Sequence, residues 1–304
     1  MFKPGQAVKV MILLTILVLL ILTIFGCSRQ QEQASSSLPG SPGKLCVAVS
    51  IVPQASFVKA VGGDLVEVLT MIPPGANPED YAPGPQIMEQ LSKARIYFAI
   101  GVPTETNGIL PRLQQINPQM KVVDLPRQAD QVYPAREMAP GEKDPHRWLS
   151  PKRAIIMVQS IAQELAAADP KNAATYQNNA RRYQNELEAL NDEITAALAG
   201  LSGQSFIVYH PAMGYFAEDY GLNMIALEEE GKSATAQNIQ SVIDQAKKEN
   251  IKVVFYQAEM DSRQAQTLAR ELGGEAELIA PLAADYIDNL RKTAQLFARV
   301  LGPQ

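Results

Sequence analysis

The chain has 304 residues, of which 46% are hydrophobic and 19% are charged, a composition typical of a folded globular protein and not of a disordered one. Its formal net charge is −5, whereas proteins that bind nucleic acid carry a basic surface, so we expect no nucleic-acid partner. The chain has only two histidines, and histidine is the side chain that most often binds metals.

The first 26 residues have the pattern of a secretory signal peptide. Met1–Val10 carries lysine and no acid, and the apolar run Met11–Phe25 is short for a segment that spans a bilayer, which needs about 20 residues. The segment Ile24–Cys27 resembles a bacterial lipobox, in which cleavage leaves the cysteine as a lipidated N-terminus. We therefore expect Cys27 to anchor the protein at the extracytoplasmic face of the cell membrane without spanning it. A retained signal anchor is the alternative.

Residues 27–44 are expected to form a flexible tether. They are rich in Gln, Ser, Gly and Pro and have few apolar side chains to bury. Beyond this segment the chain has one cysteine, Cys46, in the apolar run LCVAVSIV, so no disulfide is expected within the folded part. We expect Cys46 to be a buried, small apolar side chain.

Two blocks of the chain alternate short β-branched runs with amphipathic segments, which is the pattern of parallel sheets with helical connections. In the first block, residues 45–170, we expect strands at Cys46–Val52, Val66–Ile72, Ile96–Ile100 and Lys121–Asp124. In the second block, residues 203–304, we expect strands at Ser205–Tyr209, Met224–Leu227, Lys252–Tyr256 and Ala276–Ile279. The sequence thus predicts an α/β fold of two lobes, each with a mostly parallel four-stranded sheet.

A long helix is predicted between the two blocks. Ser150 and Pro151 suit the N-cap and first position of one helix, which ends before Asp169-Pro170. Residues 171–202 then carry apolar side chains at intervals of three and four, without Pro or Gly until Gly200. A helix of this length would be about 45 Å long and would link the lobes rigidly, which disfavours a large hinge closure.

Four side chains with metal-binding chemistry fall next to the ends of expected strands and helices. Glu79 lies in the loop PPGANPEDYAP, His146 precedes a helix, His210 follows the strand SFIVY, and Asp285 begins the last helix. Ligands of open α/β sheets bind beyond the carboxyl ends of the strands, so we expect these side chains to meet between the lobes. Two imidazoles and two carboxylates can bind zinc or manganese.

Five motifs between Leu45 and the C-terminus form a specific set: SIVPQASFVKAVGG, MIPPGANPEDYAPGPQIMEQLSKARIYFAIG, DPHRWLSP, HPAMGYFAEDYGL and IAPLAADYIDNL. Together they resemble the metal-binding lipoproteins of bacterial zinc and manganese ABC importers. The resemblance implies two lobes joined by one long helix, a divalent ion bound between them, and delivery of the ion to a membrane permease. It also implies that His146, His210 and Asp285 are ligands, and we expect a monomer that is not an enzyme.

The loop around Glu79 departs from the family pattern PPGxxPHxYxP, which has histidine at this position. We expect Glu79 to bind through oxygen, with Asp80 as the alternative ligand. A third possibility is that the ion is held by three residues and water, or weakly. The additional oxygen suits manganese as well as zinc. Zinc is nevertheless our first prediction, because the motif around His210 is similar to that of zinc-type members, and manganese is the alternative.

Three further features bear on the site. One of Glu228, Glu229 and Glu230 is a candidate partner or replacement ligand, while the others are expected to form a solvated turn. Trp148 is expected to pack beside His146. A metallohydrolase with Glu79 as general base is the alternative of another class, but the chain has no HExxH helix and no nucleophile elbow. An adhesin and a carrier of organic chelates are disfavoured, because no adhesive repeat and no aromatic or basic cleft is evident.

Overall fold

The computed structural model of the protein describes residues 43–228, 235–260 and 262–302. The expected signal peptide, Cys27 and nearly all of the expected tether lie outside these residues. Within them, none of the helices combines the length and the apolar character needed to cross a bilayer.

The first part of the fold is a four-stranded parallel sheet in the order β2-β1-β3-β4. Its strands are β1 (Leu45–Val49), β2 (Val66–Thr70), β3 (Ile96–Ala99) and β4 (Lys121–Asp124). The connections contain α2 (Val52–Gly62), η1 (Gly63–Leu65), α3 (Pro85–Leu91), the π-helical turn η2 (Thr104–Ile109), η3 (Leu110–Arg112) and α4 (Leu113–Ile116). Alternate residues of β1 enter different cores, Val47 and Val49 on one face and Ala48 on the other, so both faces of the sheet are covered.

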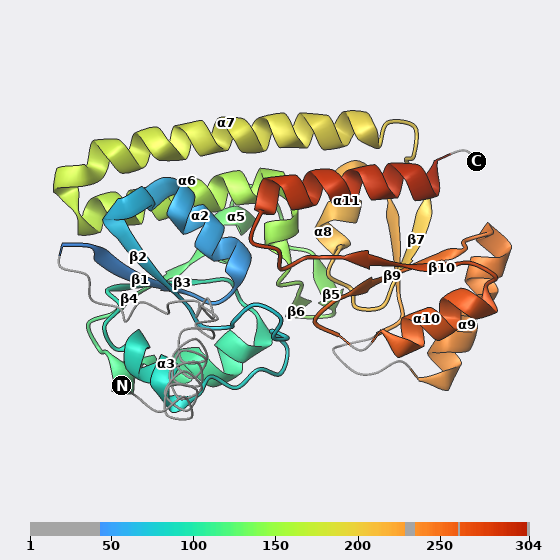
Figure 1. Ribbon diagram of the computed structural model, residues 1–304, viewed down its shortest axis with the longest axis horizontal. Coiled ribbons are helices and arrows are strands. Elements are labelled where there is room, and N and C mark those ends of the chain that lie inside the picture. Colours follow the sequence, from blue (N-terminus) through green and yellow to red (C-terminus); the bar gives the residue numbers. More distant parts are fainter. Residues whose placement is uncertain (1–42, 229–234, 261, 303–304) are drawn as a thin grey trace, which may run out of the picture. The chain divides into compact units, whose positions relative to one another are not determined.

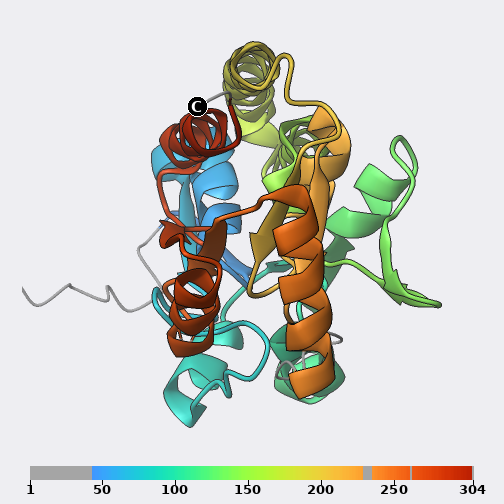
Figure 2. The same cartoon turned by 90° about the vertical axis from the view of Figure 1, so that its right-hand side faces the viewer.

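The second part is another four-stranded parallel sheet, in the order β10-β9-β7-β8. Its strands are β7 (Ser205–Val208), β8 (Asn223–Ala226), β9 (Val253–Gln257) and β10 (Glu275–Ile279). The helices are α8 (Gly214–Tyr220), α9 (Ala236–Glu249), α10 (Arg263–Glu271) and α11 (Tyr286–Leu301). Side chains of α9 and α10 share a core with one face of the sheet, and Phe216 of α8 and Phe297 of α11 share the core of the other face. Helices α9 and α10 accordingly lie on the opposite side of the sheet from α11 (Figure 2).

A helical layer joins the two sheets. After α5 (Leu125–Asp130) come the antiparallel hairpin β5 (Glu137–Ala139) and β6 (Glu142–Lys143), the turn η4 (Arg147–Leu149), α6 (Pro151–Ala168), η5 (Pro170–Asn172) and α7 (Ala173–Ala197). Helix α7 packs against α2 and α6 and also against α11, so it contacts elements that flank both sheets (Figure 1). Buried Tyr176, Leu187 and Ile194 lie on its inner face, and the main core is continuous through this layer.

The predicted fold class is confirmed, with local differences. Strand β1 ends at Val49 and not at Val52, because Pro53 occupies the first turn of α2 and the Gln54 side chain accepts the N–H groups of Ser50 and Ile51. Helix α7 has 25 residues, so it is roughly 37 Å long and shorter than expected. The Ser150 cap of α6 is present, with its side chain accepting from the Arg153 N–H. The lobe boundaries remain predictions.

Candidate metal centre

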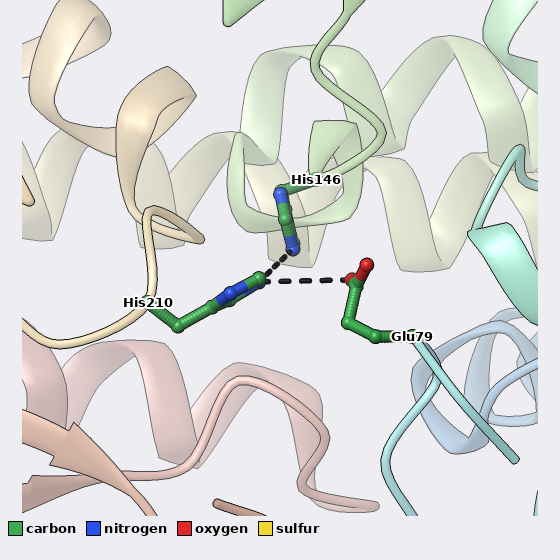
Figure 3. Close-up of side chains that lie close together, drawn as sticks. All are labelled: Glu79, His146 and His210. Carbon is green, nitrogen blue, oxygen red and sulfur yellow. Dashed lines mark hydrogen bonds and ion pairs between the residues drawn. The ribbon is translucent and has the colours of Figure 1, made fainter. Parts of the chain in front are cut away.

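Three side chains from distant parts of the chain converge. Glu79, His146 and His210 each offer one ligand atom, and these atoms all lie within 4.8 Å of one another (Figure 3). His146 Nε2 lies 3.2 Å from His210 Nε2, which in turn lies 3.7 Å from Glu79 Oε1. Two atoms bound to a tetrahedral zinc at 2.0–2.1 Å are about 3.3 Å apart, so this spacing suits one shared ion. Both histidines are only 4% exposed.

The loop between β2 and α3 holds Glu79 through backbone contacts on both sides. The Glu79 N–H donates to the Asn77 side chain, which makes a tight turn before the carboxylate. The Thr104 N–H donates to the Pro78 carbonyl, and the Thr104 hydroxyl donates to the Tyr81 carbonyl. The loop is therefore tied to the start of η2, and Glu79 reaches the histidines while Asp80 is exposed and outside the ligand group.

His146 is oriented by a buried carboxylate two residues earlier. Its Nδ1 lies 2.8 Å from Asp144 Oδ1, which also accepts the His146 backbone N–H. The other oxygen of Asp144 accepts from Arg136 at 3.0 Å. Burial by itself would raise the pKa of Asp144, but its contacts with His146 and Arg136 hold that pKa below its usual range. Asp144 is thus a carboxylate that fixes the ring of His146 from behind.

His210 has an equivalent partner in the second part of the fold. Its backbone directly follows β7, and its Nδ1 lies 2.6 Å from Glu228 Oε2. Glu228 comes just after β8, the strand next to β7, so the sheet places the two side chains together. The prediction of a partner role within the acidic turn is confirmed for Glu228, whereas Glu229 and Glu230 lie outside the described residues.

The carboxylates of Asp144 and Glu228 determine which ring nitrogen of each histidine can bind a metal. If each Nδ1–H donates to its carboxylate, each Nε2 presents a lone pair. The Nε2 atoms of His146 and His210 then face each other across 3.2 Å with no proton to share. Glu79 adds a further negative oxygen beside them. Such an arrangement of electron donors is stabilised by a cation placed between them, which is the chemistry of a metal site.

Glu79 lies in a partly desolvated position. Burial is the main cause that raises its pKa above the ordinary range, and Glu228, Asp80 and Glu142 raise it further, while His210 lowers it. A carboxylate that is held in this way accepts either a proton or a metal ion. A proton and a bound cation therefore compete for this carboxylate.

Asp285 is the predicted ligand that the structure does not bring to the group. It is exposed and stands at the N-cap position of α11 without a side-chain capping bond, and its charge acts on Tyr183 of α7 and on the cations Arg291 and Lys292. Trp148, in contrast, packs as predicted, with its ring centroid 5.1 Å from that of His146 and its indole N–H donating to the Pro281 carbonyl.

Two residues of the site, Asp144 and Arg136, were not predicted from the sequence. Asp144 stands two residues before His146 in DPHRWLSP, and an acid so close to a ligand histidine was an available signal. Arg136 gave no such signal, because it is positioned by the fold around β5 and β6. Its N–H donates to the Tyr215 hydroxyl oxygen, and that hydroxyl donates to the Asp144 carbonyl.

Comparisons with known proteins identify relatives that cover most of the chain. Residues 47–300 match the family model described as zinc-uptake complex component A, periplasmic. The metal ABC transporter substrate-binding lipoprotein SsaB of Streptococcus sanguinis is 28% identical over 270 residues, covering 85% of each chain. The zinc-binding protein AdcA of Streptococcus pyogenes is 27% identical, and the match covers 90% of this chain but 60% of AdcA. A crystal structure of ZnuA is 38% identical with a TM-score of 0.80, covering 85% of this chain and 100% of that one.

Proposed function

The chain belongs to the zinc-uptake complex component A family, and from this premise we propose that it is a receptor that captures a divalent metal ion. The ion is its cargo, with zinc as the first candidate and manganese as the second. The receptor delivers the ion to the permease of an ABC importer. We further propose that it acts as a monomer at the extracytoplasmic face of the membrane, held there by a lipid on Cys27.

One observation carries this proposal. Glu79, His146 and His210 place ligand atoms within 4.8 Å of one another, and carboxylates orient both imidazoles from behind. These contacts make the imidazoles better ligands and fix their ring orientations, which is how proteins prepare histidines for metals. We propose these three residues as the protein ligands. Asp285 remains a ligand predicted from the sequence alone.

The donor set supports zinc as the first candidate. Two imidazole nitrogens and one carboxylate form a mixed nitrogen and oxygen site without sulfur, at spacings suited to four-coordinate zinc. Manganese prefers more oxygen ligands, so the presence of Glu79 keeps it as the second candidate.

A receptor fits this site better than a hydrolase does. The chain has neither an HExxH helix nor a nucleophile elbow, and both histidines of the site are almost fully buried. The Glu79 Oε1 atom lies 3.7 Å from His210 Nε2, a separation at which both atoms can bind the same ion. A carboxylate that binds the ion is not free to act as a general base. Hydrolysis of simple esters or peptides that disappears in Glu79→Gln would favour the hydrolase instead.

Titration calorimetry of the metal-free protein with Zn²⁺ tests the proposal. We expect one ion per chain, and a loss of affinity of at least 100-fold in His146→Ala and in His210→Ala. Asp80→Asn is the matched control, because Asp80 is exposed and adjoins Glu79 without joining the ligand group. An isotherm of His210→Ala equal to that of the unmodified protein would refute the site.

A further inference from the structure

A small cavity adjoins the ligand group on the side of β9. Its lining includes Glu79 and His146 of the ligand group, the polar residues Gln257 and Glu259, and Trp148. Its volume of about 10 Å³ is enough for about one water molecule. Two of the three proposed ligands, Glu79 and His146, therefore border a space that can hold one small molecule.

Two polar atoms of residues at this cavity are buried without a partner. Gln257 is only 5% exposed, and its Nε2 has no hydrogen-bond partner among the described residues. The same is true of the fully buried Oε2 of Glu259. Buried polar groups are nearly always paired in folded proteins, because an unpaired one loses its hydration without replacement. These two atoms therefore point to a missing polar ligand.

The backbone holds both residues firmly at this place. Gln257 ends β9 and pairs in register with Ile279 of the neighbouring strand β10. The Met260 N–H donates back to the Gln257 carbonyl, which closes a turn around Glu259. The sheet and the turn that follows it therefore fix the backbone that carries both unpaired atoms.

The unpaired groups have complementary chemistry. The Gln257 amide donates a hydrogen bond, the Glu259 carboxylate accepts one, and a water molecule can satisfy both at once. Glu259 itself is not among the residues whose ligand atoms gather within 4.8 Å. A direct bond from Glu259 to the ion is therefore less well supported than a contact through water.

We propose that Gln257 and Glu259 hold a water molecule that completes the coordination of the bound ion; this inference rests on the function proposed above. The water gives one lone pair to the ion, accepts a hydrogen bond from Gln257 Nε2 and donates one to Glu259 Oε2. Three protein ligands and one water make a four-coordinate site, in which Gln257 and Glu259 are positioning residues. Asp285 is then not required as a ligand.

Substitutions of Gln257 and Glu259 test the proposal. For Gln257, the stability of the metal-free protein and the affinity for zinc should change in opposite directions. Gln257→Leu keeps the volume but removes the unpaired donor, so the metal-free protein should melt at a higher temperature, while zinc affinity falls about 10-fold. A merely structural role of Gln257 would lower the melting temperature. Glu259→Gln should also weaken zinc binding about 10-fold. Glu275→Gln is the control, because it removes the same charge from an exposed position on β10.

A cobalt-substituted protein tests the water directly. Azide should replace the water and change the visible spectrum of bound Co²⁺, both in the unmodified protein and in Asp285→Asn. No response to azide would overturn the proposal, and so would zinc affinities of Gln257→Leu and Glu259→Gln that equal that of Glu275→Gln. If the unmodified protein binds no zinc, or if His210→Ala binds as tightly, the proposed function itself fails. If the unmodified protein binds zinc and His210→Ala binds it more weakly, a negative result with azide or with the Gln257 and Glu259 variants contradicts only the proposed water and not the proposed function.

Discussion

Gly214 leaves open the space that the carboxylate of Asp144 occupies: a Cβ built on Gly214 would come within 2.7 Å of Asp144 Oδ2. It would also come within 2.5 Å of Arg136 Nη1, the other partner of that oxygen. The absence of a side chain at the start of α8 thus makes room for the ion pair that holds His146 in place.

Gly214→Ala should accordingly weaken metal binding more than it weakens the fold. Alanine favours a helix over glycine by up to about 1 kcal/mol, which offsets part of the steric cost. The added methyl group must push Arg136 or Asp144 aside, and we expect a loss of zinc affinity of about 10-fold. Calorimetry of zinc binding and thermal melting of the metal-free protein measure the two effects. A variant that binds zinc normally would show that the ion pair does not orient His146.

Asp144→Asn should lower zinc affinity by about 10- to 100-fold, since the carboxylate that holds His146 Nδ1 is lost. Glu228→Gln should act similarly through His210. Asp130→Asn is a control in the same region, because Asp130 pairs with Arg147 and contacts neither histidine. Equal affinities of all three variants would argue against the role of these carboxylates.

Glu79→His should shift the preference of the site from manganese towards zinc. A third imidazole replaces a hard oxygen ligand with a nitrogen, which suits zinc better. Competitive titration with both ions measures the ratio of affinities. Weaker binding of both ions would mean that the loop between β2 and α3 does not bring the new side chain to the metal.

Zinc binding should weaken as the pH falls, and Glu79 should contribute to this loss. Its pKa is raised, chiefly by burial, so it takes up a proton at a higher pH than an ordinary carboxylate and then competes with the ion. Calorimetry in buffers of different ionisation enthalpy counts the protons released on binding. At mildly acidic pH, Glu79→Gln should release fewer protons than the unmodified protein. Equal numbers would show that Glu79 is already ionised.

Stability should depend on pH through Glu105, a fully buried acid in the first part of the fold. Burial raises its pKa from 4.5 to about 7, against hydrogen bonds from Ser50, Ile100 and Gly101 that lower it. Because the folded state binds the proton more tightly than the unfolded state, stability is retained below pH 4.5 and falls as the pH rises to 7. The loss should reach about 3 kcal/mol.

Urea unfolding between pH 5 and 8 measures this dependence. Glu105→Gln should flatten it, because the amide does not titrate. Glu89→Gln, which alters an exposed acid on α3, should keep the dependence of the unmodified protein. A slope that survives in Glu105→Gln would assign the effect to another group.

Much of the fold could be predicted because periodicity reports burial. The inner strands β1, β3, β7 and β9 are largely buried and appear as short apolar runs, and the inner face of α7 shows the spacing of a helix. The hairpin β5–β6 gave no such signal, since its strands are very short and largely exposed. Helix α2 could not be distinguished from the preceding strand, because its buried residues continue the apolar run of β1.

The site divides in a similar way between sequence and structure. By itself the sequence predicted the chemistry: two histidines and two acids at the ends of expected strands and helices, and therefore a mixed nitrogen and oxygen site. Only the tertiary structure decided that Glu79 and not Asp80 reaches the histidines, that Asp144 and Glu228 hold them, and that Asp285 lies elsewhere. The physical reason is that residue type fixes what an atom can bind, whereas separations of tens of residues say nothing about distance. Distances are set by the pairing of strands and by the loops that the packed core holds in place.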